Sequence, residues 1–201
     1  MIRRALFAAW LAGALPGHAA TIAVLVKDAS GAPLEDAIAW AVPKAPVASR
    51  PKPAAVEQIG KTFVPLVTVV QAGAPITFPN RDDTRHHVYS FSPAKVFEIK
   101  LYAGTPSAPI VFDKPGDVVL GCNIHDNMIG YIYVVDSPFF GKAAADGAVR
   151  LEGLPPGDYT LRAWHYAQAA AAAPQALTVH GDEAIDATFT FTTRPKVPRG
   201  R

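Results

Sequence analysis

The sequence of 201 residues predicts an all-β protein, with one antiparallel β-sandwich followed by a second, smaller β-sandwich. Three observations lead to this prediction. Short runs rich in β-branched and aromatic residues recur along the chain, and Gly, Pro, Asn and Asp separate them. No stretch shows the apolar period of about 3.6 residues that is typical of an amphipathic helix. Alternating apolar residues along the short runs would fill the space between two packed sheets.

The first residues predict a secretory signal at 1–20. Arg3 and Arg4 form its charged start, and an apolar stretch that is too short to span a bilayer follows them. Small residues suit cleavage near Ala19 or Ala20. We therefore expect a periplasmic protein with no stable membrane insertion. Without Arg3 and Arg4 the chain has equal numbers of basic and acidic residues, which gives no indication of a nucleic-acid partner.

The segment 21–60 is expected to contain β-strands and a proline-rich loop. Residues 21–26 and 37–42 have the composition of strands, and the turn between them contains Gly31 and Pro33. Residues 43–53 carry several prolines and no apolar pattern, which is typical of an extended surface loop. These strands are expected to join one of the two sandwiches, and the pattern does not indicate which one.

The segment 61–136 is expected to form the first sandwich, and 137–192 the second. Residues 193–201 form a short basic tail. Asp146 and Gly147 predict a hairpin, and 154–158 predict a tight turn. The alanine-rich stretch 168–174 fits a surface loop or a helical turn. The strands predicted in the two segments are 66–70, 74–78, 86–91, 97–101, 109–112, 118–120, 131–135, 149–151, 159–164, 176–179 and 187–191.

One loop between two predicted strands carries the residues most suited to chemistry. It contains Cys122, which is the only cysteine, with His125 three residues later and Met128 after three more. An exported protein rarely keeps a free thiol in an oxidising compartment, and binding a metal as thiolate would explain this one. A buried, inert cysteine is the alternative.

The three side-chain types indicate the class of metal. Thiolate and imidazole suit a soft or borderline ion, and a thioether is a normal weak axial ligand of copper. Two His and one Cys in a plane, with a distant Met, form a blue-copper electron-transfer site. The second imidazole must come from elsewhere in the chain, and His86 and His87 are the candidates.

Part of the chain resembles the cupredoxins, the blue-copper family. The spacing of Cys122, His125 and Met128 is that of amicyanin-type members, which serve methylamine-oxidising systems, whereas plastocyanin-like members usually have a longer gap before the Met. The whole chain also resembles exported methylamine-utilisation proteins. The residues that carry the resemblance lie at 61–65, 73–82, 86–88 and 116–135.

The resemblance implies a Greek-key sandwich that binds one type 1 copper through His86, Cys122, His125 and Met128. His87 stands where the family often has Asn, and it would replace His86 if the strand shifted by one residue. Asp126 stands where the family often has Pro. An unsolvated carboxylate there would lower the reduction potential, so that Asp126→Asn would raise it.

Residues 137–192 resemble the small sandwich of carboxypeptidase regulatory-like and transthyretin-like modules. The resemblance rests on Asp146 and Gly147, on the turn at 154–157, and on Tyr159 and Leu161. Such motifs describe a fold and no chemistry.

We therefore expect a periplasmic electron carrier rather than an enzyme, because a fully ligated copper leaves no open position for a substrate. His125, surrounded by Ile124, Ile129 and Pro115, is the expected electron exit. A c-type cytochrome or a periplasmic dehydrogenase is the expected partner. The alternatives are a copper-binding or delivery protein, and a non-redox structural module with a vestigial or zinc site.

Two other groups of polar residues attract attention. Trp164 and His165 are adjacent in sequence, but no further ligand lies near them, so we expect a hydrogen-bonded structural histidine. Asp82 and Asp83 form a carboxylate pair in a turn before a strand, where they are expected to cap backbone N–H groups.

Overall fold

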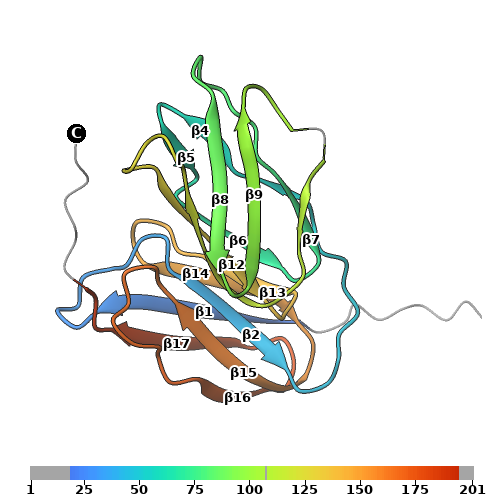
Figure 1. Cartoon of the computed structure of the whole chain (residues 1–201). Helices are drawn as coiled ribbons and strands as arrows, with labels where there is room; N and C mark the ends of the chain where they lie inside the picture. Colours follow the sequence, from blue (N-terminus) through green and yellow to red (C-terminus); the bar gives the residue numbers. More distant parts are fainter. Residues whose placement is uncertain (1–18, 107, 195–201) are drawn as a thin grey trace, which may run out of the picture.

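The computed structural model describes residues 19–106 and 108–194, and its regular structure is entirely β (Figure 1). The prediction of an all-β fold is confirmed. None of the described residues forms a helix of the length and apolar character that crossing a membrane requires. Most of the expected signal at 1–20 and most of the basic tail at 193–201 lie outside the described residues.

The strands between residues 54 and 135 form one sandwich, which we call the site sandwich. Its larger sheet has the order β6-β12-β11-β8-β9, and β10-β7-β3 and the hairpin β4-β5 complete it. Its apolar core is packed between these sheets. The strands are β3 (Ala54–Ala55), β4 (Glu57–Ile59), β5 (Thr62–Val64), β6 (Val67–Gln71), β7 (Ala74–Thr77), β8 (His86–Ser92), β9 (Lys95–Tyr102), β10 (Ile110–Phe112), β11 (Gly116–Gly121) and β12 (Ile129–Val135).

The remaining strands form a second unit, the terminal sandwich. One sheet has the order β14-β1-β17 and the other β13-β2-β15-β16, with a separate apolar core between them. The strands are β1 (Ala20–Asp28), β2 (Ile38–Pro43), β13 (Phe139–Lys142), β14 (Ala148–Leu154), β15 (Gly157–Trp164), β16 (Gln175–Val179) and β17 (Ala184–Phe191).

The N-terminal strands lie inside the terminal sandwich, next to strands from the far end of the chain (Figure 1). β1 pairs with β14 on one side and with β17 on the other, and β2 pairs with β13 and β15. The described part of the chain therefore starts in the terminal sandwich, builds the site sandwich, and returns to complete the terminal sandwich.

Strand direction differs from the expectation of antiparallel sheets. β1 runs parallel to β17, β12 to β6, and β3 to β7. An alternating apolar pattern specifies which face of a strand is buried, and it carries no information on the direction of its neighbour.

Two local features of the terminal sandwich also differ from expectation. β13 was not expected, because its sequence contains two phenylalanines beside a glycine without alternation. The Asp146–Gly147 turn joins β13 to β14, but these strands belong to different sheets, so it closes no hairpin. Gly147 has φ 74°, and a Cβ there would lie 2.4 Å from the carbonyl oxygen of Val26, so the position requires glycine.

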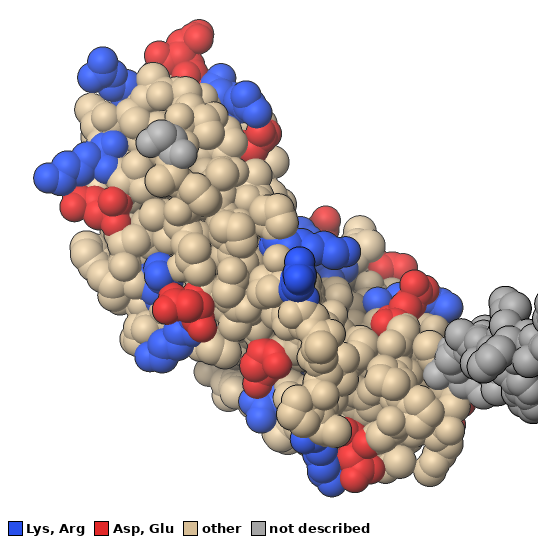
Figure 2. Space-filling view, turned by 90° about the vertical axis from the view of Figure 1, so that its right-hand side faces the viewer, with Lys and Arg blue, Asp and Glu red and all other residues tan. Residues whose placement is uncertain are grey.

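An aromatic cluster joins the two sandwiches. Trp40 of β2 and Trp164 of β15 pack against Tyr131 and Tyr133 of β12. The ring centroids of Trp40 and Tyr133 are 5.0 Å apart, and those of Tyr133 and Trp164 are 4.8 Å apart. On the face shown in Figure 2, basic and acidic side chains are interspersed, and neither sign forms a continuous field.

Candidate metal centre

The predicted metal loop joins β11 to β12 at one end of the site sandwich. Gly121 and Ile129 are opposite each other in the β11–β12 ladder, so residues 122–128 form the connection. The backbone N–H of Met128 donates to the carbonyl oxygen of His125 (3.0 Å), which closes a tight turn. Cys122 and Met128 both point into the apolar core and are 5% and 1% exposed.

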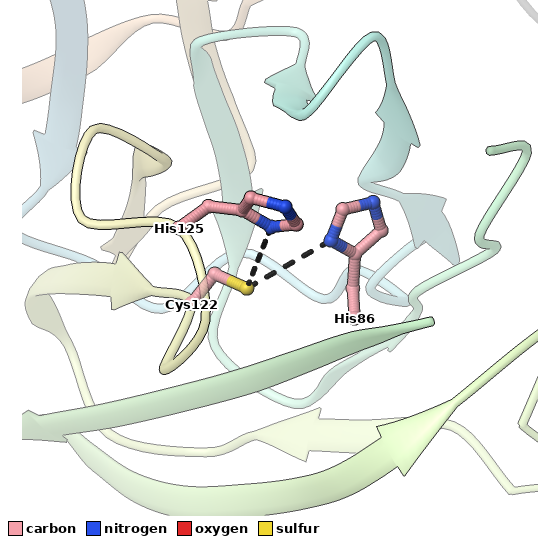
Figure 3. A group of neighbouring side chains, drawn as sticks. All are labelled: His86, Cys122 and His125. Atoms are coloured by element: carbon pink, nitrogen blue, oxygen red, sulfur yellow. Dashed lines mark hydrogen bonds between the residues drawn. The ribbon is translucent and has the colours of Figure 1, made fainter. Parts of the chain in front are cut away.

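β8 brings a second histidine to this loop. His86 is the first residue of β8, which pairs with β11 in the same sheet. Its Nδ1 lies 3.8 Å from Cys122 Sγ, and His125 Nδ1 lies 3.8 Å from the same sulfur (Figure 3). One ligand atom from each of the three residues lies within 4.8 Å of the other two.

The donor set and its spacing fit a single metal ion. Bonds of about 2.3 Å to sulfur and about 2.0 Å to nitrogen, opened by about 120°, would hold the two atoms about 3.7 Å apart. The observed separation of 3.8 Å for both sulfur–nitrogen pairs is close to this value. A thiolate with two neutral imidazoles is a donor set for copper or zinc.

His86, rather than His87, approaches the cysteine. The ladder between β8 and β9 shifts register between His86 and Val88, and His86 faces the core with no exposed surface. His87 points to the other face of the sheet, where its Nε2 lies 3.0 Å from a Glu98 carboxylate oxygen without hydrogen-bond geometry. The alternative in which His87 replaces His86 at the cysteine is therefore not what the structure shows.

The second nitrogen of His86 has a partner of its own. Its Nε2 lies 2.8 Å from a carboxylate oxygen of Asp82. The same carboxylate accepts hydrogen bonds from the backbone N–H groups of Gly60 (2.6 Å) and Lys61 (2.9 Å), in the turn between β4 and β5. The expectation that Asp82 caps backbone N–H groups is confirmed. Its contact with His86 was missed, although Asp82 lies only four residues upstream.

The surroundings of the site lower the pKa values of His125 and Asp82. Burial lowers the pKa of His125, and the nearby positive charge of Lys61 also lowers it, which favours the neutral imidazole at neutral pH. Partial burial alone would raise the pKa of Asp82. Hydrogen bonds from Lys61, His86 and Gly60 outweigh it and lower this pKa, so the carboxylate is ionised.

The surroundings of the loop differ in part from expectation. Ile124 and Ile129 are 47% and 45% exposed, as an apolar patch beside His125 requires. Pro115 precedes β11, whereas the metal loop follows it, so Pro115 lies at the far end of this strand and does not belong to that patch. Asp126 is exposed to solvent, so the unsolvated carboxylate considered from the sequence is not present.

An open hollow of about 480 Å³ lies on the cysteine side of the site. Tyr89, Phe91, Val119 and Ile129 contribute its apolar lining, and Cys122 also lines it. Sequence reasoning had not indicated this hollow, because its lining comes from three strands whose neighbour relations only the folded sheet establishes.

His165 has the structural role expected of it. Its Nε2 lies 3.1 Å from the carbonyl oxygen of Glu35, and its Nδ1 accepts the backbone N–H of Ala167 (3.3 Å). The ring is buried. Both nitrogens therefore bind the backbone and hold the end of β15 in place.

Several solved structures are similar to part of this chain. A copper-containing nitrite reductase from Thermus scotoductus SA-01 is 28% identical over 47% of this chain and 25% of its own, with a TM-score of 0.40. A purple cupredoxin from Nitrosopumilus maritimus is 21% identical over 41% of this chain and 99% of its own, with a TM-score of 0.37. An oxidised mutant of amicyanin is 16% identical over 40% of this chain and 80% of its own, with a TM-score of 0.37. No protein-family model and no curated protein matches the chain.

The site sandwich has a cupredoxin-like fold. The similar structures cover less than half of this chain, and their TM-scores are 0.40 or lower. The larger sheet places β8 beside β11 and β12, and the loop after β11 then meets the first residue of β8. The histidine of one strand and the cysteine–histidine loop of its neighbour converge at one end of the sandwich, as the resemblance implied.

Proposed function

We propose that this protein is a periplasmic type 1 copper protein that passes single electrons between redox partners. The observation that supports this most strongly is the group of His86, Cys122 and His125, whose ligand atoms lie within 4.8 Å of one another, with His86 and Cys122 buried. The proposal assigns Cys122 as the thiolate ligand, His86 and His125 as the imidazole ligands, and Met128 as the weak axial ligand.

The protein's own contribution is to keep the ligands in place. A copper ion bound there would alternate between Cu(II) and Cu(I). Cys122 and Met128 are fixed in the apolar core, and His86 is fixed at the start of β8. Ligands that are held in this way change their positions little between the two oxidation states of the metal, and this favours fast electron transfer.

Electrons are proposed to pass through His125, which is the least buried of the three donors. The exposed Ile124 and Ile129 flank it and suit a small apolar contact. Weak redox encounters use interfaces of this kind. The partner is proposed to be a c-type cytochrome or a periplasmic dehydrogenase, and the location follows from the predicted export signal.

The test is to add Cu(II) to the purified chain and record the visible spectrum. We expect an intense thiolate-to-copper band that is lost in Cys122→Ser, because serine offers no thiolate. His86→Ala is expected to abolish or strongly shift the band. The matched variant His87→Ala is expected to retain it, because His87 lies on the other face of β8.

Two other results would point to other functions. A site that releases copper rapidly to a soluble chelator and shows no reversible one-electron wave would indicate copper delivery. A chain that binds Zn²⁺ and gives no coloured copper complex would indicate a structural site. Either result contradicts the electron-transfer proposal.

A further inference from the structure

Both ring nitrogens of His86 have defined partners. Nδ1 faces the sulfur of Cys122 at 3.8 Å, and Nε2 lies 2.8 Å from the carboxylate of Asp82. A neutral imidazole carries one proton, and an ionised carboxylate can only accept a hydrogen bond. The proton must therefore lie on Nε2 for this contact to form, which leaves the lone pair of Nδ1 directed toward the sulfur.

We propose that Asp82 is a positioning residue for the metal site, which fixes the tautomer and ring orientation of His86 so that Nδ1 is its metal-binding atom. This inference rests on the proposed function in naming a metal, but the tautomer itself is a property of the metal-free chain. It assigns a role in the site to the β4–β5 turn, from which no ligand comes.

The carboxylate is itself held from two sides. The N–H groups of Gly60 and Lys61 bind it, and both residues have positive φ (60° and 58°), which turns these two N–H groups toward the same point. The backbone N–H of Asp82 donates to Asn80 Oδ1 (3.0 Å), and Asn80 Nδ2 donates to the carbonyl oxygen of Thr84 (2.8 Å). These hydrogen bonds hold Asp82 in place in addition to its contact with His86.

Burial makes the contact stronger than a surface ion pair. The side chain of His86 is 0% exposed and that of Asp82 is 16% exposed. Little water can replace the carboxylate at Nε2, and the local dielectric constant is lower than in solvent. A carboxylate bound to the outer nitrogen of a histidine increases the electron density that the inner nitrogen donates. Greater donation by this nitrogen favours the oxidised, more positive form of a bound copper ion.

The experiment compares Asp82→Asn and Asp82→Ala with Asp83→Asn. The amide introduced by Asp82→Asn keeps an oxygen that can accept from Nε2 and removes the charge, whereas alanine removes both. Asp83 is exposed, so Asp83→Asn removes the same charge one residue away without the contact. The first readout is the His86 tautomer in the metal-free full chain, from proton–nitrogen NMR of the ring. The second is the reduction potential with copper bound.

We expect metal-free wild type and Asp83→Asn to carry the proton on Nε2, and Asp82→Ala to lose that preference. With copper, Asp82→Asn should raise the reduction potential clearly more than Asp83→Asn does. Wild type with the proton on Nδ1, an unchanged tautomer in Asp82→Ala, or equal potential shifts in the two Asn variants would overturn the inference. Failure to bind copper would overturn the proposed function alone, because the NMR result still decides the role of Asp82.

Discussion

Single charged residues around the candidate site are expected to affect its reduction potential to different degrees, depending on how exposed they are to solvent. Asp82 and Asp126 are both carboxylates close in sequence to a histidine of the site. Asp82 contacts His86 at 2.8 Å and is largely shielded, whereas Asp126 is open to solvent. Water and salt screen an exposed charge, so proximity in sequence is a poor guide to its effect.

This difference predicts a small effect of Asp126→Asn. We expect its reduction potential to rise much less than that of Asp82→Asn, because solvent already screens the charge that is removed. Redox titration of the two copper-loaded variants at the same ionic strength gives the comparison. A shift for Asp126→Asn as large as that for Asp82→Asn would show that its carboxylate acts on the metal directly.

At the scale of elements, the hairpin β4–β5 depends on a close approach to β12. Gly130 of β12 lies against Phe63 of β5, and a Cβ at Gly130 would lie 2.8 Å from Phe63 Cβ. Phe63 is buried in the core of the site sandwich, so it has little room to move. Because the turn of this hairpin holds Asp82, the contact helps to place the support of His86.

Gly130→Ala is therefore expected to destabilise the protein by about 1–3 kcal/mol, the usual cost of overpacking a core. It should also weaken copper binding, since displacement of β5 moves the turn away from Asp82. Chemical denaturation and copper competition measure the two effects. The control is Gly181→Ala, where nothing lies within 4 Å of the added Cβ, and which should change neither quantity. Equal stability of the two variants would contradict the packing argument.

On the scale of the whole molecule, the aromatic cluster couples the two sandwiches. Trp164 is 8% exposed and packs against Tyr131 and Tyr133, which belong to the same strand that follows the metal loop. Trp40 adds a hydrogen bond from its Nε1 to the carboxylate of Asp136 (3.0 Å), at the point where the chain leaves the site sandwich. Such a buried aromatic contact favours unfolding of the two units together.

Trp164→Ala is expected to reduce the free energy of unfolding by about 3–5 kcal/mol, as for other buried tryptophans. It should also convert one calorimetric transition into two, because the units then unfold separately. The control is Val149→Ala in the core of the terminal sandwich, which should lower stability and preserve a single transition. Two transitions in the wild-type protein would contradict the coupling.

The sequence by itself determined the all-β class, the position of most strands, and the loop that carries Cys122, His125 and Met128. These features are local, because alternation and turn residues act over a few neighbouring positions. Short strands such as β3 and β4, and the unpatterned β13, were not predicted because tertiary contacts rather than their own sequences stabilise them.

Tertiary structure alone decided which strands are neighbours. It placed β1 between β14 and β17, set the parallel pairs, and brought His86 rather than His87 to Cys122. It also placed Asp82 on the outer nitrogen of His86, through a turn more than twenty residues away. The physical reason is that a pleated strand specifies the faces of its own side chains, whereas its partner and register are selected only when the whole core packs.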